Sequence, residues 1–295
     1  MKELGLFIYT ETSLHAGTGS TVSAVDLPIQ RERTTRHPLV QGSGVKGALR
    51  MVIEKKVGKD DKSFLATFGP ETDNAEAHAG AISVGDARIV LFPVQSLAGV
   101  FAYITCPMVL ARIHRNLPKF PIFSQMVETG DAFITKSSAV TTSNQVVLEE
   151  FSFSAKAHDD VDKIAQWLIK YAFPAGDEYQ FWRNKVANSL VVLSDEDFTE
   201  FTVNSTEIVT RIKIDSAKKT AVQGALWTQE SLPSDTLLMS AITIVNSRKP
   251  DQLMTADDIY TWLNDNDNGN LPSRMQLGGD ETTGQGFIAV RISEG

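Results

Sequence analysis

The sequence has little cysteine, no long apolar run and no excess of positive charge, and each absence excludes a class of protein. Its single cysteine, Cys106, cannot form a disulfide within the chain. No uninterrupted apolar stretch reaches the roughly 18 residues of a membrane-spanning helix, and the first residues lack the layout of a signal peptide. We therefore expect a cytoplasmic protein with no membrane partner.

The charge balance argues against binding nucleic acid through overall charge. The 295 residues include 28 Lys and Arg against 36 Asp and Glu, a formal net charge of −8. Proteins that coat nucleic acid by bulk electrostatics usually have a basic face and a high isoelectric point. Composition alone therefore favours a metabolic enzyme or an assembly component, and any RNA site must be local.

Apolar periodicity predicts a mixture of strands and helices. Strands are expected at residues 4–10, 80–94, 100–105, 145–153, 236–245 and 287–292. Helices are expected at residues 45–53, 107–113, 161–169 and 255–263. Residues 207–214 alternate strictly and, with 222–227, predict a β-hairpin. Because these elements follow no regular βαβ rhythm, the sequence predicts an α+β fold with mainly antiparallel strands.

The long segment Glu11–Pro38 has too little apolar periodicity for a helix and is expected to be a functional loop. Near its start, Gly17 and Gly19 could expose backbone N–H groups to a phosphate, and His15 could transfer a proton or donate a hydrogen bond. A glycine-bent loop with an incidental histidine is the plainer interpretation.

The same loop contains one carboxylate followed by two cations. Asp26 could bind a divalent metal or orient an attacking hydroxyl, while Arg31 and Arg33 could hold phosphate oxygens. Taken alone, Asp26 could equally be a solvated residue of a turn, since loops are rich in aspartate. Spacing does not decide between these interpretations.

A glycine-rich turn leads into a helix at Gln41–Arg50. Ser43 is a candidate cap, and the exposed N–H groups of a helix start suit a phosphate. Lys46 and Arg50 are four residues apart and share a helix face. The motif is not a Walker P-loop, because Gly47 stands where a hydroxyl would hold Mg²⁺. An ordinarily capped helix with a solvated basic face is the alternative.

A second glycine-rich stretch, Leu277–Phe287, precedes the last strand. It holds four glycines in nine residues, which implies close approach of the backbone to another loop or to a sugar-phosphate chain.

Taken in this order, these stretches resemble the RAMP superfamily, which combines a leading strand, a Ser-x-x-Lys-Gly-x-Leu-Arg helix start and a C-terminal glycine-rich loop. The sequence is more closely similar to the backbone subunits of type III-B CRISPR (Cmr) effectors. The segments that carry this resemblance are His15–Gly19, Asp26–Glu32, Gly85–Arg88, Phe92–Val94, Thr105 with Pro107, Gly224–Trp227 with Glu230, and Gly278–Gly284.

The resemblance implies one elaborated domain over residues 1–295, with a modified ferredoxin-like (RRM-like) core, insertions and a protruding β-hairpin thumb at residues 207–227. It also implies guide RNA, target RNA and other Cmr-type subunits as partners. Copies of the chain would associate into a helical backbone and cleave target RNA at regular intervals.

By motif match, Asp26 corresponds to the residue required for cleavage and would hold Mg²⁺ or Mn²⁺, with His15 and Glu230 as further catalytic candidates. The expected RNA-binding residues are Arg31, Arg33, Ser43, Lys46, Arg50, Gly278, Gly279, Thr283 and Gly284. The expected chemistry is attack of a ribose 2′-OH on the adjacent phosphodiester, at a nucleotide that the thumb flips out. Gln285 departs from the pattern, because relatives often carry a basic residue there.

Three other interpretations stay open. The chain could be a guide-RNA-binding scaffold without nuclease activity, in which Asp26→Ala would change nothing measurable. It could be a guide-processing ribonuclease that depends on His15 and not on Asp26. A metabolic enzyme is favoured by the negative charge alone.

Overall fold

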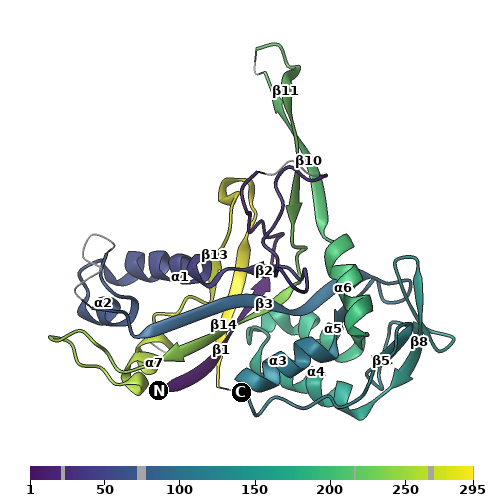
Figure 1. Ribbon diagram of the computed structural model, residues 1–295, viewed down its shortest axis with the longest axis horizontal. Coiled ribbons are helices and arrows are strands. Elements are labelled where there is room, and N and C mark those ends of the chain that lie inside the picture. Colours follow the sequence, from purple (N-terminus) through teal and green to yellow (C-terminus); the bar gives the residue numbers. More distant parts are fainter. Residues whose placement is uncertain (21–23, 72–77, 216, 265–268, 295) are drawn as a thin grey trace.

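The computed structural model describes residues 1–20, 24–71, 78–215, 217–264 and 269–294. A mixed sheet runs through an elongated body, helices gather at both ends of that body, and one β-hairpin projects far from it (Figure 1). The described part of the chain therefore combines α and β structure, as predicted.

Four strands form the central part of the large sheet, in the order β14-β1-β12-β3, and each neighbouring pair is antiparallel. They are β1 (Lys2–Thr10), β3 (Ile82–Gln95), β12 (Leu237–Ile244) and β14 (Phe287–Ser293). The short strands β2 (Leu39–Val40) and β13 (Arg274–Gln276) pair with β3 and β14. Residues 4–10 of β1 are buried, because the sheet is covered on both faces there. The four strands predicted in these regions are confirmed.

Three helices lie at one end of the body (Figure 1). They are α1 (Gly42–Val57), α2 (Lys62–Phe68) and α7 (Ala256–Asn264). The apolar stripe that predicted α1 is buried, but the prediction that Ser43 caps this helix is wrong. The helix begins at Gly42, whose N–H donates to the carboxylate of Asp86 in β3 at 2.9 Å. Ser43 already lies inside the first turn, and a carboxylate from the sheet takes the capping role.

The chain between β3 and the hairpin builds the other end of the body (Figure 1). Its strands are β4 (Phe101–Thr105), β5 (Asp131–Ile134), β6 (Thr141–Thr142), β7 (Gln145–Leu148), β8 (Phe151–Ala157) and β9 (Leu190–Val192). Its helices are α3 (Pro107–Asn116), α4 (Asp159–Tyr171), α5 (Gln180–Ser189) and α6 (Asp195–Asn204). The β4–β9 and β5–β8 pairs are parallel, so the sheet is mixed. None of the helices in the described ranges is long and apolar enough to cross a membrane.

The single strand predicted at residues 145–153 is wrong. The segment is a hairpin in which β7 and β8 pair antiparallel, with Leu148 opposite Phe151. The turn falls at Glu149 and Glu150, and Glu149 has a φ of 50°. Before the turn the buried residues are the even-numbered Val146 and Leu148, and after it the buried residue is the odd-numbered Phe153. A single continuous strand would keep the same alternation, so this change was the signal that a turn intervenes.

The projecting hairpin consists of β10 (Glu207–Ile214) and β11 (Ala221–Ser231), which pair only with each other. The predicted hairpin is confirmed, although its second strand continues beyond the predicted residue 227 to Ser231. Large apolar side chains along it are exposed to solvent: Ile208, Val209, Ile212, Ile214, Val222 and Leu226. An exposed apolar ribbon of this kind indicates a surface that a partner covers.

In its described residues, 11–20 and 24–38, the predicted loop contains neither a helix nor a regular strand. Instead it folds against the base of the hairpin. Isolated β-bridges join Leu14 to Leu232 and Leu27 to Gln229. These bridges place the loop residues singled out by sequence beside β11.

Candidate functional site

Asp26 is an exposed carboxylate on the loop and is held by the hairpin. Its Oδ2 accepts hydrogen bonds from the backbone N–H and the hydroxyl of Thr228 in β11, at 2.7 and 2.9 Å. The Asp26 N–H donates to the same hydroxyl at 3.0 Å. The backbone bond first, and then the hydroxyl bond, lower the pKa of Asp26 below its ordinary value. Asp26 therefore carries a full negative charge at neutral pH in a fixed position.

Glu230, a second expected catalytic residue, is buried at the base of the hairpin with only 6% of its surface exposed. Its Oε1 accepts from Arg31 at 2.5 Å and from the Thr206 hydroxyl at 2.8 Å, and its Oε2 accepts from the Ile29 N–H at 3.0 Å. Arg31 also donates to backbone carbonyls. The geometry gives both residues the role of tying the loop to the hairpin, and their expected catalytic and RNA-binding roles stay predictions.

His15 contacts both the hairpin and the glycine-rich loop. Its Nδ1 lies 2.6 Å from the carbonyl oxygen of Glu230, and its own carbonyl accepts a hydrogen bond from the Gly279 N–H at 2.9 Å. Gly17 leaves room for the imidazole, because a Cβ there would lie 2.6 Å from Nε2. With Nδ1 facing a carbonyl, the neutral ring carries its proton on Nδ1 and presents Nε2 as an acceptor.

The glycine-rich loop packs against the His15 segment and against the hairpin. Gly278 has a φ of +84°, and a Cβ there would lie 2.6 Å from the His15 carbonyl oxygen. Gln229 in β11 donates to the Asp280 carboxylate at 2.5 Å, and Arg211 in β10 lies 3.4 Å from the same carboxylate. The sequence left open whether the glycines approach another loop or a sugar-phosphate chain. In the structure they approach another protein loop, the one that contains His15.

Three expected RNA-binding residues lie on α1, away from these contacts. Ser43 is exposed. The Lys46 ammonium donates to the Ile82 carbonyl at 3.1 Å, and the Arg50 guanidinium donates to the Gly69 carbonyl at 2.7 Å. Burial first, and then the nearby charge of Arg50, lower the pKa of Lys46. The N–H of Gly42 already bonds to a carboxylate, so a phosphate at this helix start would meet negative charge.

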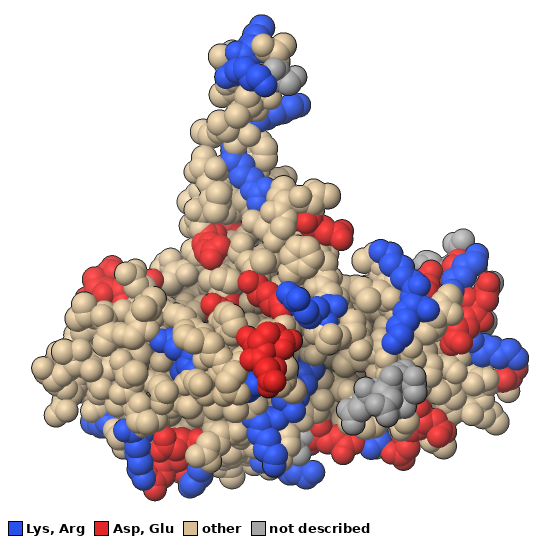
Figure 2. Space-filling view, turned by 180° about the vertical axis from the view of Figure 1, so that it is seen from behind, with Lys and Arg blue, Asp and Glu red and all other residues tan. Residues whose placement is uncertain are grey.

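Positive charge is concentrated on the hairpin. Figure 2 shows Lys and Arg side chains along it and at its tip. Among the described residues of 208–227, the charged ones are Arg211, Lys213, Lys218 and Lys219 against Asp215. A chain that is acidic as a whole therefore presents a local basic surface. A local surface of this kind is what the sequence analysis required of an RNA site in an acidic chain. The expected RNA-binding residues Arg33, Thr283 and Gly284 are also exposed.

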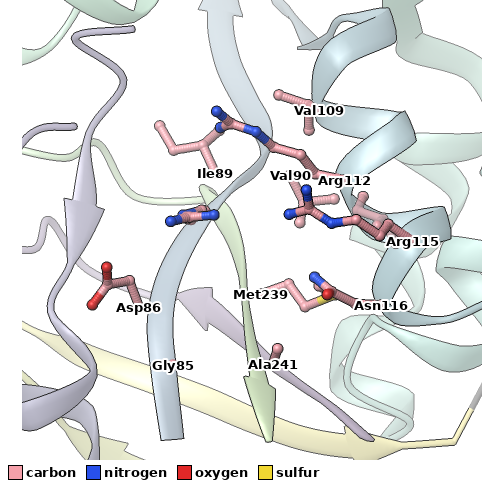
Figure 3. A pocket seen from close by; sticks show the side chains of 12 residues that line it. Gly85, Asp86, Ile89, Val90, Val109, Arg112, Arg115, Asn116, Met239 and Ala241 are labelled. Atoms are coloured by element: carbon pink, nitrogen blue, oxygen red, sulfur yellow. The ribbon is translucent and has the colours of Figure 1, made fainter. Parts of the chain in front are cut away.

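An arginine-lined cavity of about 170 Å³ lies between β3, β12 and α3, and sequence reasoning did not predict it (Figure 3). Arg112 and Arg115 extend into it from α3. Arg88 of β3 also lines it. Glu32 of the loop lies 2.8 Å from Arg88 and 3.0 Å from Arg112. Burial alone would raise the pKa of Glu32, but hydrogen bonds from Thr35 and Arg112 and the arginine charges outweigh it and lower the pKa. Glu32 thus fastens the loop to the body.

Ligands for a divalent metal are few around Asp26. In the part of the chain that the structure describes, no group of three or more His, Cys, Asp and Glu side chains could hold a metal ion. Mg²⁺ often binds through one carboxylate, substrate phosphates and several waters. Asp26 fits that mode, because its bonds to Thr228 use Oδ2 and not Oδ1.

Comparison with known proteins decides the family. A model of the RAMP superfamily matches residues 7–289. The chain belongs to the RAMP superfamily. Over its whole length this RAMP protein is 35% identical to the CRISPR system Cmr endoribonuclease Cmr4 of Pyrococcus furiosus, with 97% of that protein covered. It is 25% identical to the CRISPR system CMR subunit Cmr4 of Saccharolobus solfataricus, over 97% of the chain and 94% of the relative.

Solved structures of RAMP proteins have the same fold. Oligomeric Cmr4 from Pyrococcus furiosus superposes with a TM-score of 0.73 at 29% identity, covering 99% of this chain and 98% of that one. A chain of the type III-B Cmr-beta complex bound to cognate target RNA superposes with a TM-score of 0.75 at 22% identity, covering 99% of this chain and 97% of that one, and this likeness concerns the fold alone.

The structure gives linking roles to residues of this RAMP protein that sequence reasoning did not name as site residues. Thr228, Gln229 and Asp280 link the hairpin to the two loops, and Glu32 links one loop to Arg112. Thr228 and Gln229 lie in the sequence directly before Glu230, which the family resemblance did single out. Alternation along β11 was the available signal for Thr228, since residues two apart on a strand face the same side, whereas Gln229 faces the other side.

Proposed function

We propose that this chain is the repeated backbone subunit of a type III-B CRISPR (Cmr) effector, in which it binds guide RNA and cleaves the paired target RNA. The observation that carries the proposal is the exposed, ionised and hydrogen-bonded Asp26, in a chain 35% identical over its length to a Cmr endoribonuclease. The oligomeric form of the Pyrococcus relative supports self-association into a backbone alongside other Cmr-type subunits. A subunit that acts on transcripts would work in the cytoplasm.

The central strands support a single domain over residues 1–295 built on a ferredoxin-like core. The order β14-β1-β12-β3, with α1 after β1 and α7 before β14, is a βαββαβ arrangement into which the segment between β3 and β12 is inserted. The β10–β11 hairpin would serve as the thumb. Its basic residues suit the RNA backbone, and its exposed apolar side chains suit unstacked bases.

The site supports cleavage by positioning and charge, without a dense metal cluster. A thumb inserted between base steps would flip one nucleotide out and place its 2′-OH in line with the adjacent phosphodiester. Asp26, held at the base of that thumb, would orient this hydroxyl or bind Mg²⁺ or Mn²⁺ together with the phosphate. The metal would neutralise charge that develops on the phosphate oxygens. His15 would assist through Nε2, and Glu230 would keep the loop seated.

A non-catalytic scaffold is the second candidate, and one observation favours it. Asp26 is one carboxylate, and the described residues contain no group of three metal ligands. In that case a partner subunit would supply the nuclease.

Cleavage of a labelled, guide-complementary RNA by the reconstituted complex with Mg²⁺ tests the proposal. Asp26→Ala should abolish the regularly spaced cuts and leave target binding unchanged. Asp60→Ala is the matched control, because Asp60 is exposed and its side chain makes no hydrogen bond or ion pair among the described residues. Cuts that persist unchanged in Asp26→Ala would make the chain a scaffold.

A further inference from the structure

We propose that Thr228 is a positioning residue that sets the orientation of the Asp26 carboxylate. The inference rests on the proposed role of Asp26 in cleavage. Thr228 lies on β11, in the part of the hairpin that meets the loop, and its side chain and main chain both bind the aspartate.

The contact is reciprocal. The Thr228 hydroxyl donates to Oδ2 of Asp26 at 2.9 Å and accepts from the Asp26 N–H at 3.0 Å. The Thr228 N–H donates to the same Oδ2 at 2.7 Å. A hydroxyl can donate and accept through the same oxygen, so serine can replace threonine here and valine cannot. Two donors hold Oδ2 in place, and Oδ1 is the oxygen left to face RNA or a metal.

An exposed carboxylate needs such a contact in order to act with defined geometry. Asp26 lies in a segment without a regular strand or helix, and a solvated side chain there would sample several rotamers. Catalysis that depends on positioning loses rate steeply when a reacting group shifts by about 1 Å. The hydroxyl of Thr228 therefore contributes to the rate without touching RNA.

The loop backbone is held separately from the side chain of Asp26. The Leu27 N–H donates to the Thr228 carbonyl at 3.0 Å, and the Glu230 N–H donates to the Leu27 carbonyl at 3.0 Å. Neither bond uses the Thr228 hydroxyl. Removing that hydroxyl should therefore leave the carboxylate with the Thr228 N–H bond alone, so that it is held less firmly, while the loop stays seated on β11.

The contact also links cleavage to the hairpin. Thr228 pairs across the hairpin with Thr210 of β10, so it belongs to the hairpin and not to the body. The orientation of Asp26 is thus set by the same element whose exposed basic and apolar side chains suit RNA.

Single-turnover cleavage in the reconstituted complex, measured for Thr228→Val, Thr228→Ser and Thr210→Val, tests this inference. We expect Thr228→Val to cleave about tenfold more slowly with unchanged target affinity, from the loss of one hydrogen bond to a charged group. Thr228→Ser should restore the rate to within about threefold of wild type, since it keeps the hydroxyl. Thr210→Val is the matched control, because Thr210 lies opposite Thr228 in the same hairpin and its exposed hydroxyl makes no hydrogen bond in the described ranges.

A carboxyl titration by NMR with labelled aspartate gives a second readout. In Thr228→Val the pKa of Asp26 should rise toward its ordinary value, which a purely packing role of Thr228 would not cause. If Thr228→Val cleaves like wild type while Asp26→Ala is inactive, the inference is wrong and the proposed function stands. If Thr228→Ser is as slow as Thr228→Val, or if target binding falls, Thr228 acts by packing or by RNA contact. If Asp26→Ala itself cleaves normally, the proposed function fails.

Discussion

Replacing Glu230 with alanine should destabilise the protein by about 3 kcal/mol. The Glu230–Arg31 pair is buried, with 7% and 14% of the two side chains exposed, and the carboxylate also binds Thr206 and the Ile29 N–H. Removing one partner of a buried pair costs about 3–5 kcal/mol. We take the lower end because Arg31 keeps two backbone carbonyls at 2.8 and 3.0 Å. In a chain of this size the loss corresponds to a melting temperature lower by about 6–10 °C.

Urea unfolding and thermal melting of the isolated chain measure this loss. Glu3→Ala is the control, because Glu3 is an exposed strand residue whose side chain makes no hydrogen bond or ion pair among the described residues. The double variant Arg31→Met with Glu230→Met should be more stable than Glu230→Ala, since it leaves no buried charge unpaired. If Glu230→Ala unfolds like Glu3→Ala and yet the complex loses cleavage, the pair does not seat the loop and Glu230 acts in the chemistry.

Three further predictions follow from backbone geometry, charge and pKa. Gly278→Ala should lower the free energy of unfolding in urea by about 2 kcal/mol, and Gly284→Ala by about 1 kcal/mol. Both glycines have a positive φ, but only a Cβ at Gly278 would meet the backbone of another segment. Equal losses would show that this backbone contact has no effect. If Lys46 holds a guide phosphate, Lys46→Met should lower the slope of log affinity against log salt by about 1, and an unchanged slope would leave it a structural residue. Because the pKa of Asp26 is lowered on folding, its bonds to the hairpin should persist from neutral pH to about 4 and be lost only as pH falls further. Lower protection of the Asp26 and Thr228 amides against hydrogen exchange would report that loss, and loss near pH 6 would contradict the hydrogen-bonded geometry.

The regular elements could be predicted well where burial imposes a period. The apolar stripe of α1 and the buried run of β1 were sufficient, since each follows the spacing of its own backbone. The β7–β8 hairpin was mistaken for one strand because the turn at Glu149 contains no glycine or proline. The cap of α1 was also mistaken, because the group that replaces Ser43 comes from a strand 44 residues away in sequence.

The candidate site was predicted as a set of residues but not as an arrangement. The motifs around His15, Asp26 and Glu230 were recognisable one by one. Their relation depends on contacts between residues about 200 apart in sequence, such as Asp26 with Thr228, and local patterns do not encode such contacts. For the same reason Glu230, expected at the chemistry, is found buried beneath the loop.

The element types, the family resemblance and the need for a local basic surface in an acidic chain could all be inferred from the sequence, because each follows from composition or from spacing along one segment. The fold is what shows which polar groups bind one another within the protein and which stay available to a partner. Arg31 pairs with Glu230, Lys46 bonds to a carbonyl, and Asp26 stays exposed on the loop, where Thr228 of β11 holds it. Such contacts escape local patterns because buried polar groups bond to the partners that the fold brings near, whatever their distance in sequence.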